Sequence, residues 1–195
     1  PPEKQPYYLE LVSSEVRRLS RLVSSLLDIT RIQAGERKFT DMEFDICEMA
    51  RQILISFEKQ IDEKKLNVEF ETDADSMTVV ADRDAIHQVL YNICHNAVKF
   101  SRPGGLYRIT IQEKNKKVLV CVYNEGDGIP AADLPYVFDR FYKSDKSRGL
   151  DKTGVGLGLY IVKTIINAHK EEIWADSEEG KYCAFTFTLR ASVEK

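Results

Sequence analysis

The sequence has no apolar run that approaches the roughly 20 residues of a membrane span, and no signal peptide stands at its N-terminus. It also has no excess of positive charge, because 28 lysines and arginines are outnumbered by 31 acidic residues and the formal net charge is −3. A protein that neutralises nucleic-acid phosphates normally has a basic balance, so no nucleic-acid partner is expected. We therefore expect this chain to be soluble and cytoplasmic.

The four cysteines are far apart and stand mostly among apolar neighbours: Cys47, Cys94, Cys121 and Cys183. This spacing fits neither a zinc knuckle nor a disulfide framework, and we expect reduced, buried thiols. Internal repeats and low-complexity tracts are absent as well. With 195 residues, 43% of them hydrophobic and 30% charged, the chain can bury one full core and carry an appendage.

The appendage is predicted at the N-terminus, where apolar residues recur at spacings of three and four: Leu9, Val12, Val16, Leu19, Val23 and Leu26. This is a heptad pattern. Leu22, Leu27 and Ile29 widen it, which favours a bundle of several helices over a two-stranded coiled coil, and Gly35 suits the C-cap. One helix cannot bury such a face alone, so we expect its partner in a second chain or upstream of Pro1. The alternative is a fragment whose helix packs on a symmetry-related copy of itself.

The rest of the chain alternates helical segments with pairs of strands. After a polar linker over residues 36–45, with room for a short strand, helices are expected over residues 46–64, 86–100 and 156–168. Strands are expected over residues 67–71, 77–81, 107–113, 118–123, 172–177 and 184–189, with a hairpin turn at Asn115. Strands in adjacent pairs favour a mixed or antiparallel sheet with all helices on one face. The predicted fold class is therefore α+β: residues 1–35 contribute one long helix after a non-helical lead-in at residues 1–6, and residues 36–195 form a two-layer sandwich.

The helix over residues 86–100, with Asp82 as its N-cap, carries two stripes. Its apolar stripe consists of Ile86, Val89, Leu90, Ile93, Ala97 and Phe100. Asn92 and Asn96 are four residues apart and Lys99 follows three residues later, so two amides and an ammonium share a narrower stripe beside it. Amide oxygens suit a hard cation such as Mg²⁺, and lysine suits phosphate. The pattern indicates a nucleotide-phosphate site, and an ordinary solvated flank is the alternative.

Two glycine-rich segments follow this helix. Residues 124–130, Asn-Glu-Gly-Asp-Gly-Ile-Pro, come directly after a strand, where glycines let a ligand approach the backbone closely. Residues 154–159, Gly-Val-Gly-Leu-Gly-Leu, open a helix whose free amide groups and positive dipole end suit phosphates. Between them, residues 138–143, Phe-Asp-Arg-Phe-Tyr-Lys, precede a polar segment, residues 144–153, with the composition of a mobile lid.

In this order, the asparagine helix, the glycine-rich segments and the aromatic segment resemble the catalytic ATP-binding domain of sensor histidine kinases, whose fold is shared with gyrase and heat-shock chaperone ATPases. Residues 8–35 also resemble the second helix of that family's dimerisation domain, through Arg-Leu-Ser-Arg-Leu-Val at residues 18–23 and Leu-Leu-Asp at residues 26–28. The resemblance implies transfer of the γ-phosphoryl group of Mg·ATP to a histidine and relay to a response regulator. It further implies a homodimer through the helical bundle, and membrane anchoring only through segments upstream of Pro1.

The resemblance also implies roles for residues of the asparagine helix and the aromatic segment. Asn96 would be the principal Mg²⁺ ligand, assisted by Asn92, and Lys99 would contact phosphate. Lys143 would stand against the γ-phosphate, which makes Asn96 and Lys143 the catalytic pair. Arg140 would either contact phosphate or form an interdomain salt bridge.

For the glycine-rich segments, the resemblance implies that Gly126 and Gly128 admit adenine beside Asn124. The phosphates would be wrapped by Gly154, Gly156, Leu157 and Gly158. Phe138 and Phe141 would pack the base of the lid.

Three departures from the family pattern bear on activity. Asn124 replaces the usual adenine-binding aspartate, and a neutral acceptor weakens that hydrogen bond by about 1 kcal/mol. Tyr-Cys-Ala at residues 182–184 replaces a glycine-threonine pair, and Lys-Glu at residues 170–171 replaces glycines. These changes leave open an alternative function, a nucleotide-binding regulatory module without kinase activity. A purely helical oligomerisation protein would explain the heptads but not the glycine-rich and aromatic segments.

No histidine of this sequence stands where the family has its phosphate acceptor. The family's acceptor histidine lies on the first dimerisation helix, whereas His87 and His95 lie on the asparagine helix and His169 ends the last helix. We expect His95 to face solvent or to support the metal site indirectly rather than to act as a base. The acceptor helix is expected upstream of Pro1.

Overall fold

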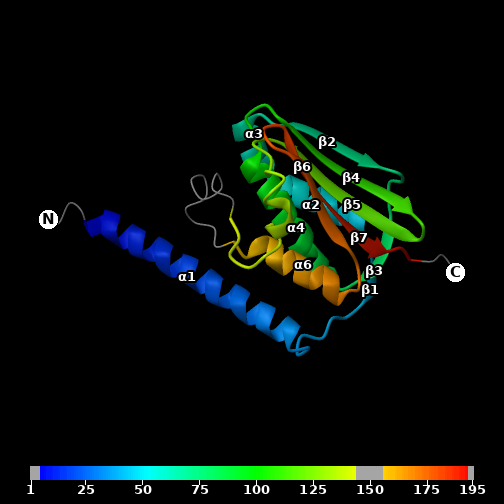
Figure 1. Ribbon diagram of the computed structural model, residues 1–195, viewed down its shortest axis with the longest axis horizontal. Helices are drawn as coiled ribbons and strands as arrows, with labels where there is room; N and C mark the ends of the chain where they lie inside the picture. The colour runs from blue at the N-terminus through cyan, green and yellow to red at the C-terminus, as the bar shows by residue number, and fades with distance from the viewer. Residues whose placement is uncertain (1–4, 144–155, 193–195) are drawn as a thin grey trace.

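The computed structural model of the chain describes residues 5–143 and 156–192 (Figure 1). The helices are α1 (Gln5–Gln33), α2 (Ile46–Ser56), α3 (Glu58–Lys64), α4 (Arg83–Phe100), a short 3-10 helix η2 (Leu134–Tyr136) and α6 (Gly158–Ala168). The strands are β1 (Met42–Asp45), β2 (Asn67–Thr72), β3 (Thr78–Ala81), β4 (Leu106–Lys114), β5 (Lys117–Glu125), β6 (Ile173–Glu178) and β7 (Tyr182–Arg190). None of the described helices is long and apolar enough to cross a membrane.

Five strands form one mixed sheet in the order β2-β4-β5-β7-β6, in which β2 and β4 are parallel and the other neighbours antiparallel. Figure 1 shows α2, α4 and α6 on one face of this sheet, which confirms the predicted two-layer α+β sandwich. The β4–β5 hairpin turns at Asn115 and Lys116, whose φ angles of 54° and 63° are those of a type I′ turn. The predicted hairpin is therefore confirmed, with slightly longer strands on both sides.

The two strands predicted before α4 do not pair with each other. The backbone N–H of Asn67 donates to the Gly105 carbonyl at 3.0 Å, which starts β2 alongside β4. β3 instead pairs with β1, because the Ile46 N–H donates to the Met77 carbonyl at 3.0 Å and holds the start of β3 against the end of β1. The sheet order is therefore set by contacts far apart in sequence.

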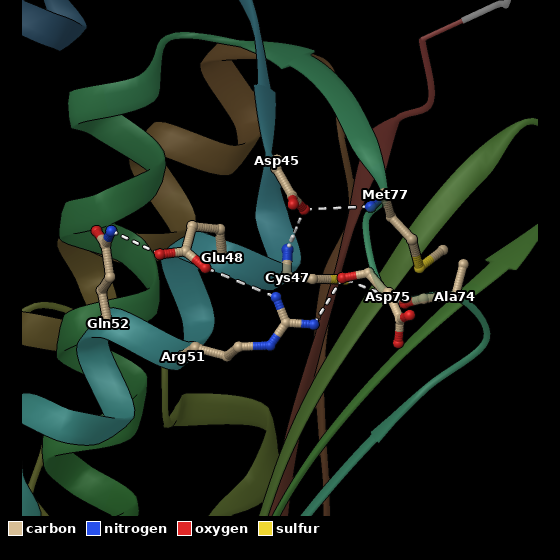
Figure 2. A network of polar contacts seen from close by, with 8 residues as sticks. All are labelled: Asp45, Cys47, Glu48, Arg51, Gln52, Ala74, Asp75 and Met77. Carbon is tan, nitrogen blue, oxygen red and sulfur yellow. Dashed lines mark hydrogen bonds and ion pairs between the residues drawn. The ribbon is translucent and has the colours of Figure 1, made fainter.

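Asp45 connects the start of α2 to the loop before β3, as Figure 2 shows. Its carboxylate accepts the backbone N–H of Cys47 at 2.9 Å and that of Met77 at 3.1 Å. Burial raises the pKa of Asp45, but these backbone hydrogen bonds outweigh burial and lower it overall. In the same network, Arg51 donates to the Asp75 carbonyl at 2.6 Å, so one helix turn is fixed to the β2–β3 loop at two points.

The single helix predicted over residues 46–64 is wrong, because the chain breaks it into α2 and α3 at Phe57. Phe57 leaves helical geometry (φ −101°, ψ 5°), and its side chain is buried against α4. Its ring lies 5.1 Å from that of Tyr91 and 6.2 Å from that of His95, centroid to centroid. The chain thus leaves helical geometry at the residue whose ring packs against α4, and it then turns into α3.

The C-terminal part of α1 packs against the sandwich of the same chain. Ile29 is buried against α6, and Leu22, Leu26 and Ile32 pack partly against the same core. The expectation that α1 has no partner in this chain is therefore wrong for its C-terminal part. Apolar side chains along the rest of the helix stay exposed: Leu9, Leu11, Val12, Val16, Leu19, Val23 and Leu27. The helix ends at Gln33, and Gly35 caps it as predicted, with a φ of 70° and an N–H that donates to the Ile32 carbonyl.

The four thiols are free, as the cysteine spacing predicted. Cys47, Cys94 and Cys183 are buried and Cys121 is half-buried. Burial raises the pKa of Cys94 and of Cys183 to about 12, so neither thiol ionises near neutral pH.

Candidate functional site

The helix that carries the predicted metal ligands begins at a well-supported cap. The Asp82 carboxylate accepts the Ala85 N–H and the Thr40 N–H, both at 2.9 Å. Burial raises the pKa of Asp82, but these backbone hydrogen bonds lower it overall. The Asp82 N–H in turn donates to Nε2 of His169 at 3.2 Å, while Nδ1 of His169 contacts the Ile165 carbonyl at 2.8 Å. The start of α4 is therefore fixed to the end of α6, and His169 is engaged in that contact.

The structure confirms both stripes that the helical periodicity predicted on α4. Its apolar stripe is buried apart from the half-buried Phe100: Ile86, Val89, Leu90, Ile93 and Ala97. Asn92, Asn96 and Lys99 are half-buried along one flank. On another side of the helix, the rings of His87, Tyr91 and His95 form an exposed stacked row with centroids 6.3 Å apart. His95 therefore faces solvent, one of its two predicted positions.

The C-terminal end of α4 meets the first glycine-rich segment directly. Ser101 and Gly126 form a β-bridge, and the Arg102 N–H donates to the Glu125 carbonyl at 2.9 Å. A Cβ atom at Gly126 would lie only 2.2 Å from the Phe100 carbonyl oxygen, so only glycine fits there. Contact with the Asn-bearing helix is thus one physical reason for this glycine.

Gly128 has a similar explanation at the other side of the segment. Its φ is 61°, and a Cβ atom would lie 2.3 Å from the Glu178 carbonyl oxygen, at the end of β6. Close backbone packing therefore accounts for Gly126 and Gly128, and their role beside adenine stays a prediction.

Asn124 is buried at the end of β5, on the face of the sheet that the helices cover. Its neighbours across the sheet are Tyr107 on β4 and Cys183 on β7. Tyr107 and Cys94 of α4 are fully buried, and burial raises the pKa of both side chains. The position predicted to receive adenine therefore lies at the edge of a largely apolar core, with the amide of Asn124 as a polar group at its end.

The aromatic segment and the second glycine-rich segment also meet. The Phe141 N–H donates to the Gly156 carbonyl at 3.0 Å, and a Cβ atom at Gly156 (φ 76°) would lie 2.8 Å from the Tyr142 carbonyl oxygen. Lys143, which is half-buried, follows Tyr142 directly, and Gly156 stands just before Leu157 and Gly158 at the start of α6. Gly154 and the predicted lid, residues 144–153, lie outside the described residues.

The two phenylalanines of the aromatic segment behave differently. Phe138 is buried and meets Phe185 of β7 edge-on, with ring centroids 5.9 Å apart, so its ring belongs to the core, and its packing against the lid stays a prediction. Phe141 is 55% exposed and lies outside the core, and its predicted contact with the lid involves residues outside the described ranges. Its backbone lies in the left-handed region (φ 61°) to make the turn against Gly156, and its ring stays outside the core.

Arg140 contacts α1, but through a hydrogen bond and not through the interdomain salt bridge that was one of its two predicted roles. It donates to Oε1 of Gln33 at 2.6 Å, and its guanidinium lies 4.8 Å above the ring of Tyr160. Nε2 of Gln33 donates to the Tyr160 hydroxyl at 2.7 Å, which closes a ring of three side chains. The partner is a neutral amide rather than the carboxylate of the predicted salt bridge.

Sequence reasoning missed Gln33, Tyr160 and Lys64. Gln33 and Tyr160 join α1 to α6, and Lys64 donates to carbonyls at the end of α4. No spacing rule connects residues so far apart, and each looks like an ordinary polar side chain on an amphipathic helix. Among the described residues, no group of three or more His, Cys, Asp or Glu side chains could hold a metal ion.

Comparison with known proteins gives consistent matches. Residues 81–193 match the family described as histidine kinase-, DNA gyrase B- and HSP90-like ATPase. The chain is 38% identical over 188 residues to the sensor histidine kinase WalK of Bacillus subtilis (strain 168), covering 94% of this chain and 30% of WalK. It thus spans about a third of the length of that relative.

Solved structures give the same result. The catalytic domain of histidine kinase ThkA has a TM-score of 0.68 and 32% identity, covering 77% of this chain and 97% of that domain. ThkA in complex with response regulator protein TrrA has a TM-score of 0.75 and 27% identity, covering 98% of this chain and 53% of ThkA. The second similarity extends over α1 as well as the sandwich.

Proposed function

The chain belongs to the family of histidine kinase-, DNA gyrase B- and HSP90-like ATPases, and from that premise we propose that it binds Mg·ATP and transfers the γ-phosphoryl group to a histidine upstream of this chain. Its sandwich is a histidine kinase ATPase domain of the kind that sensor kinases carry. The phosphoryl group would then pass to a response regulator, the class of partner bound to ThkA.

One arrangement carries this proposal. The flank of α4 with Asn92, Asn96 and Lys99 belongs to a helix that joins both glycine-rich segments: its end bridges to Gly126, and its side packs on α6, which Gly158 opens. The free amide groups at the start of α6 add a positive dipole end. Amides, ammonium and helix N-terminus together suit a metal–polyphosphate ligand.

The donor set fits Mg²⁺ in a specific way. Mg²⁺ keeps several of its waters and is usually held by few protein oxygens together with substrate phosphates. Two half-buried amide oxygens, from Asn96 with Asn92 assisting, match that demand without adding negative charge near the phosphates. When bound, the metal neutralises part of the phosphate charge, while Lys99 and Lys143 contribute two further positive charges. Phosphoryl transfer depends mainly on such positioning and charge stabilisation.

The same proposal assigns partners beyond this chain. The exposed apolar side chains of α1 would pack in the helical bundle of a homodimer, which would also contain the acceptor helix. A membrane anchor, if the full-length protein has one, would lie upstream of Pro1, with the ATPase domain in the cytoplasm. Gly154, Gly156 and Leu157 would complete the phosphate-binding segment.

A nucleotide-binding module without kinase activity is the second candidate. It is favoured by Asn124 and Cys183, which face each other across β5 and β7 where the family has an aspartate and a threonine. Both changes would weaken hydrogen bonds to adenine, while the residues proposed to bind the phosphates are retained.

Phosphotransfer separates the two candidates. The chain is incubated with γ-labelled ATP, alone and with the acceptor helix of a related kinase, and the products are tested for acid-labile phosphate. We expect no incorporation into the chain alone and transfer to the added helix, since the chemistry needs an in-line nucleophile about 3 Å from the phosphorus. Lys143→Ala should reduce transfer more than ATP binding.

Two results would change the assignment. Binding of Mg·ATP without transfer to any supplied helix would favour the regulatory module. Incorporation at His87, His95 or His169 would show that the acceptor is within this chain.

A further inference from the structure

The last turn of α4 is held by a lysine from another helix. The final carbonyl groups of an α-helix have no partner within the helix. Nζ of Lys64, at the end of α3, donates to the carbonyls of Val98 at 2.8 Å, Lys99 at 2.5 Å and Ser101 at 3.0 Å. One ammonium with three donors therefore satisfies three of these carbonyls, and its positive charge lies at the negative end of the helix dipole.

The backbone around Lys64 holds it in this place. α3 ends at Lys65 in the left-handed conformation (φ 52°), and the Lys64 carbonyl accepts the Gly104 N–H at 2.9 Å. The Asn67 N–H donates to the Gly105 carbonyl at 3.0 Å. The side chain of Lys64 thus contacts the last turn of α4, and the backbone at the end of α3 contacts the loop that follows it.

The surroundings of Lys64 differ from those of an ordinary surface lysine. Burial lowers the pKa of its ammonium, which shows that the group is partly withdrawn from water. Lys59 on the same helix is 85% exposed and only approaches Glu63, at 4.0 Å. Lys64 makes specific contacts, and Lys59 serves as a matched control.

The contacted turn belongs to the candidate nucleotide site. Lys99 lies within it, and Asn96 lies one turn earlier on the same helix. The remaining carbonyl of this turn, that of Phe100, packs against Gly126 of the first glycine-rich segment. The turn is therefore held on one side by Lys64 and on the other by the glycine-rich segment.

We propose that Lys64 is a positioning residue for the nucleotide site, which acts by fixing the last turn of α4 and with it the directions of Asn96 and Lys99. This inference rests on the proposed binding of Mg·ATP. Lys64 itself need not touch the nucleotide. Small displacements of metal ligands are costly, because a site works only when its groups are held within about 0.5 Å of the productive geometry.

The test compares nucleotide binding by Lys64→Met, Lys64→Gln and Lys59→Met with that of the unchanged chain. Each protein is titrated calorimetrically with ATP in Mg²⁺ and in excess EDTA, well below its thermal unfolding transition. Lys64→Met should lose about tenfold in Mg·ATP affinity, the cost typical of removing a group that orients a metal ligand. Lys64→Gln retains two donors and should lose less. The loss should be much smaller in EDTA, and Lys59→Met should bind like the unchanged chain.

A purely structural role gives a different result. Lys64→Met would then unfold at lower urea concentration, yet its folded fraction would bind ATP with unchanged affinity and Mg²⁺ dependence, and the inference would be wrong. If Lys64→Met does not fold, Lys64→Gln decides by the same criteria. If the unchanged chain binds no nucleotide, the proposed function fails, and the role of Lys64 with it.

Discussion

Helices α1 and α4 are both amphipathic, but each leaves a different kind of surface uncovered. The apolar stripe of α4 is buried under the sheet and its neighbouring helices, and the flank with Asn92, Asn96 and Lys99 remains partly accessible. Along α1, by contrast, much of the apolar stripe itself is exposed, from Leu9 to Leu27. Uncovered amides and an ammonium suit a small charged ligand, whereas an uncovered apolar stripe suits another helix.

The length of the helices explains the exposed stripe. At 1.5 Å per residue, the 29 residues of α1 extend about 44 Å and the 11 residues of α6 about 17 Å. Figure 1 shows α1 running past the end of α6 and away from the sandwich. Ile29 and Gln33 contact the sandwich near the end of α1, and within residues 5–143 and 156–192 the rest of the stripe stays exposed.

The largest expected effect concerns the exposed part of α1. The unchanged chain should self-associate through this stripe, and changing Leu19 and Val23 to Ser should make it monodisperse. These side chains are 60% and 49% exposed, so their loss should leave the fold and the nucleotide affinity intact. Multi-angle light scattering measures the association. A well-behaved monomer before any change would show that α1 needs no partner.

A smaller effect is expected where α1 does contact the sandwich. Ile29→Ala should weaken the attachment of α1 by about 2 kcal/mol, the lower end of the range for truncating a buried isoleucine. Amide hydrogen exchange in the last turns of α1 should accelerate accordingly, while exchange in α4 stays unchanged. Leu27→Ala is the control, since Leu27 is 52% exposed. Equal effects of the two substitutions would mean that α1 is not docked through Ile29.

The smallest effect is expected at Asn124, which lies at the adenine end of the proposed site. Asn124→Asp supplies a charged acceptor, and we expect about fivefold tighter binding of ATP, equivalent to about 1 kcal/mol. Because the acceptor would bind the amino group of adenine, affinity for GTP should not rise. Competition titration of the two nucleotides measures the difference. A parallel gain for both would show that Asn124 does not face the base.

The contrast between α1 and α4 also shows what a sequence can reveal. The 3.6-residue periodicity of α4 predicted both of its stripes, and the capping chemistry of Asp82 predicted its start, because these features depend on residues close in sequence. The break at Phe57 was not predictable, since residues 46–64 contain neither glycine nor proline, and the ring contact of Phe57 is with Tyr91, more than thirty positions away.

The same limit applies to contacts between elements. Lys64 donates to backbone carbonyls at the end of α4, and only the folded chain brings α3 beside them. Because backbone carbonyls are the same for every residue type, the sequence carries no signal for this contact. Arg140 could contact phosphate or another helix by its sequence position alone, and only the fold brings Gln33 beside it. Residue patterns indicate which groups are present at a site, and long-range packing determines which of them meet.

The central claim is that the polar flank of α4 holds the metal of a Mg·ATP complex, and Asn96→Ala tests it most directly. The substitution removes one amide from a half-buried position without opening the core, so circular dichroism and the unfolding midpoint should match those of the unchanged chain. His95→Ala, from the exposed row of the same helix, is the control. In calorimetric titration with ATP and Mg²⁺, the unchanged chain and His95→Ala should bind, and Asn96→Ala should show no measurable binding. Tight binding by Asn96→Ala with unchanged Mg²⁺ dependence would contradict the account.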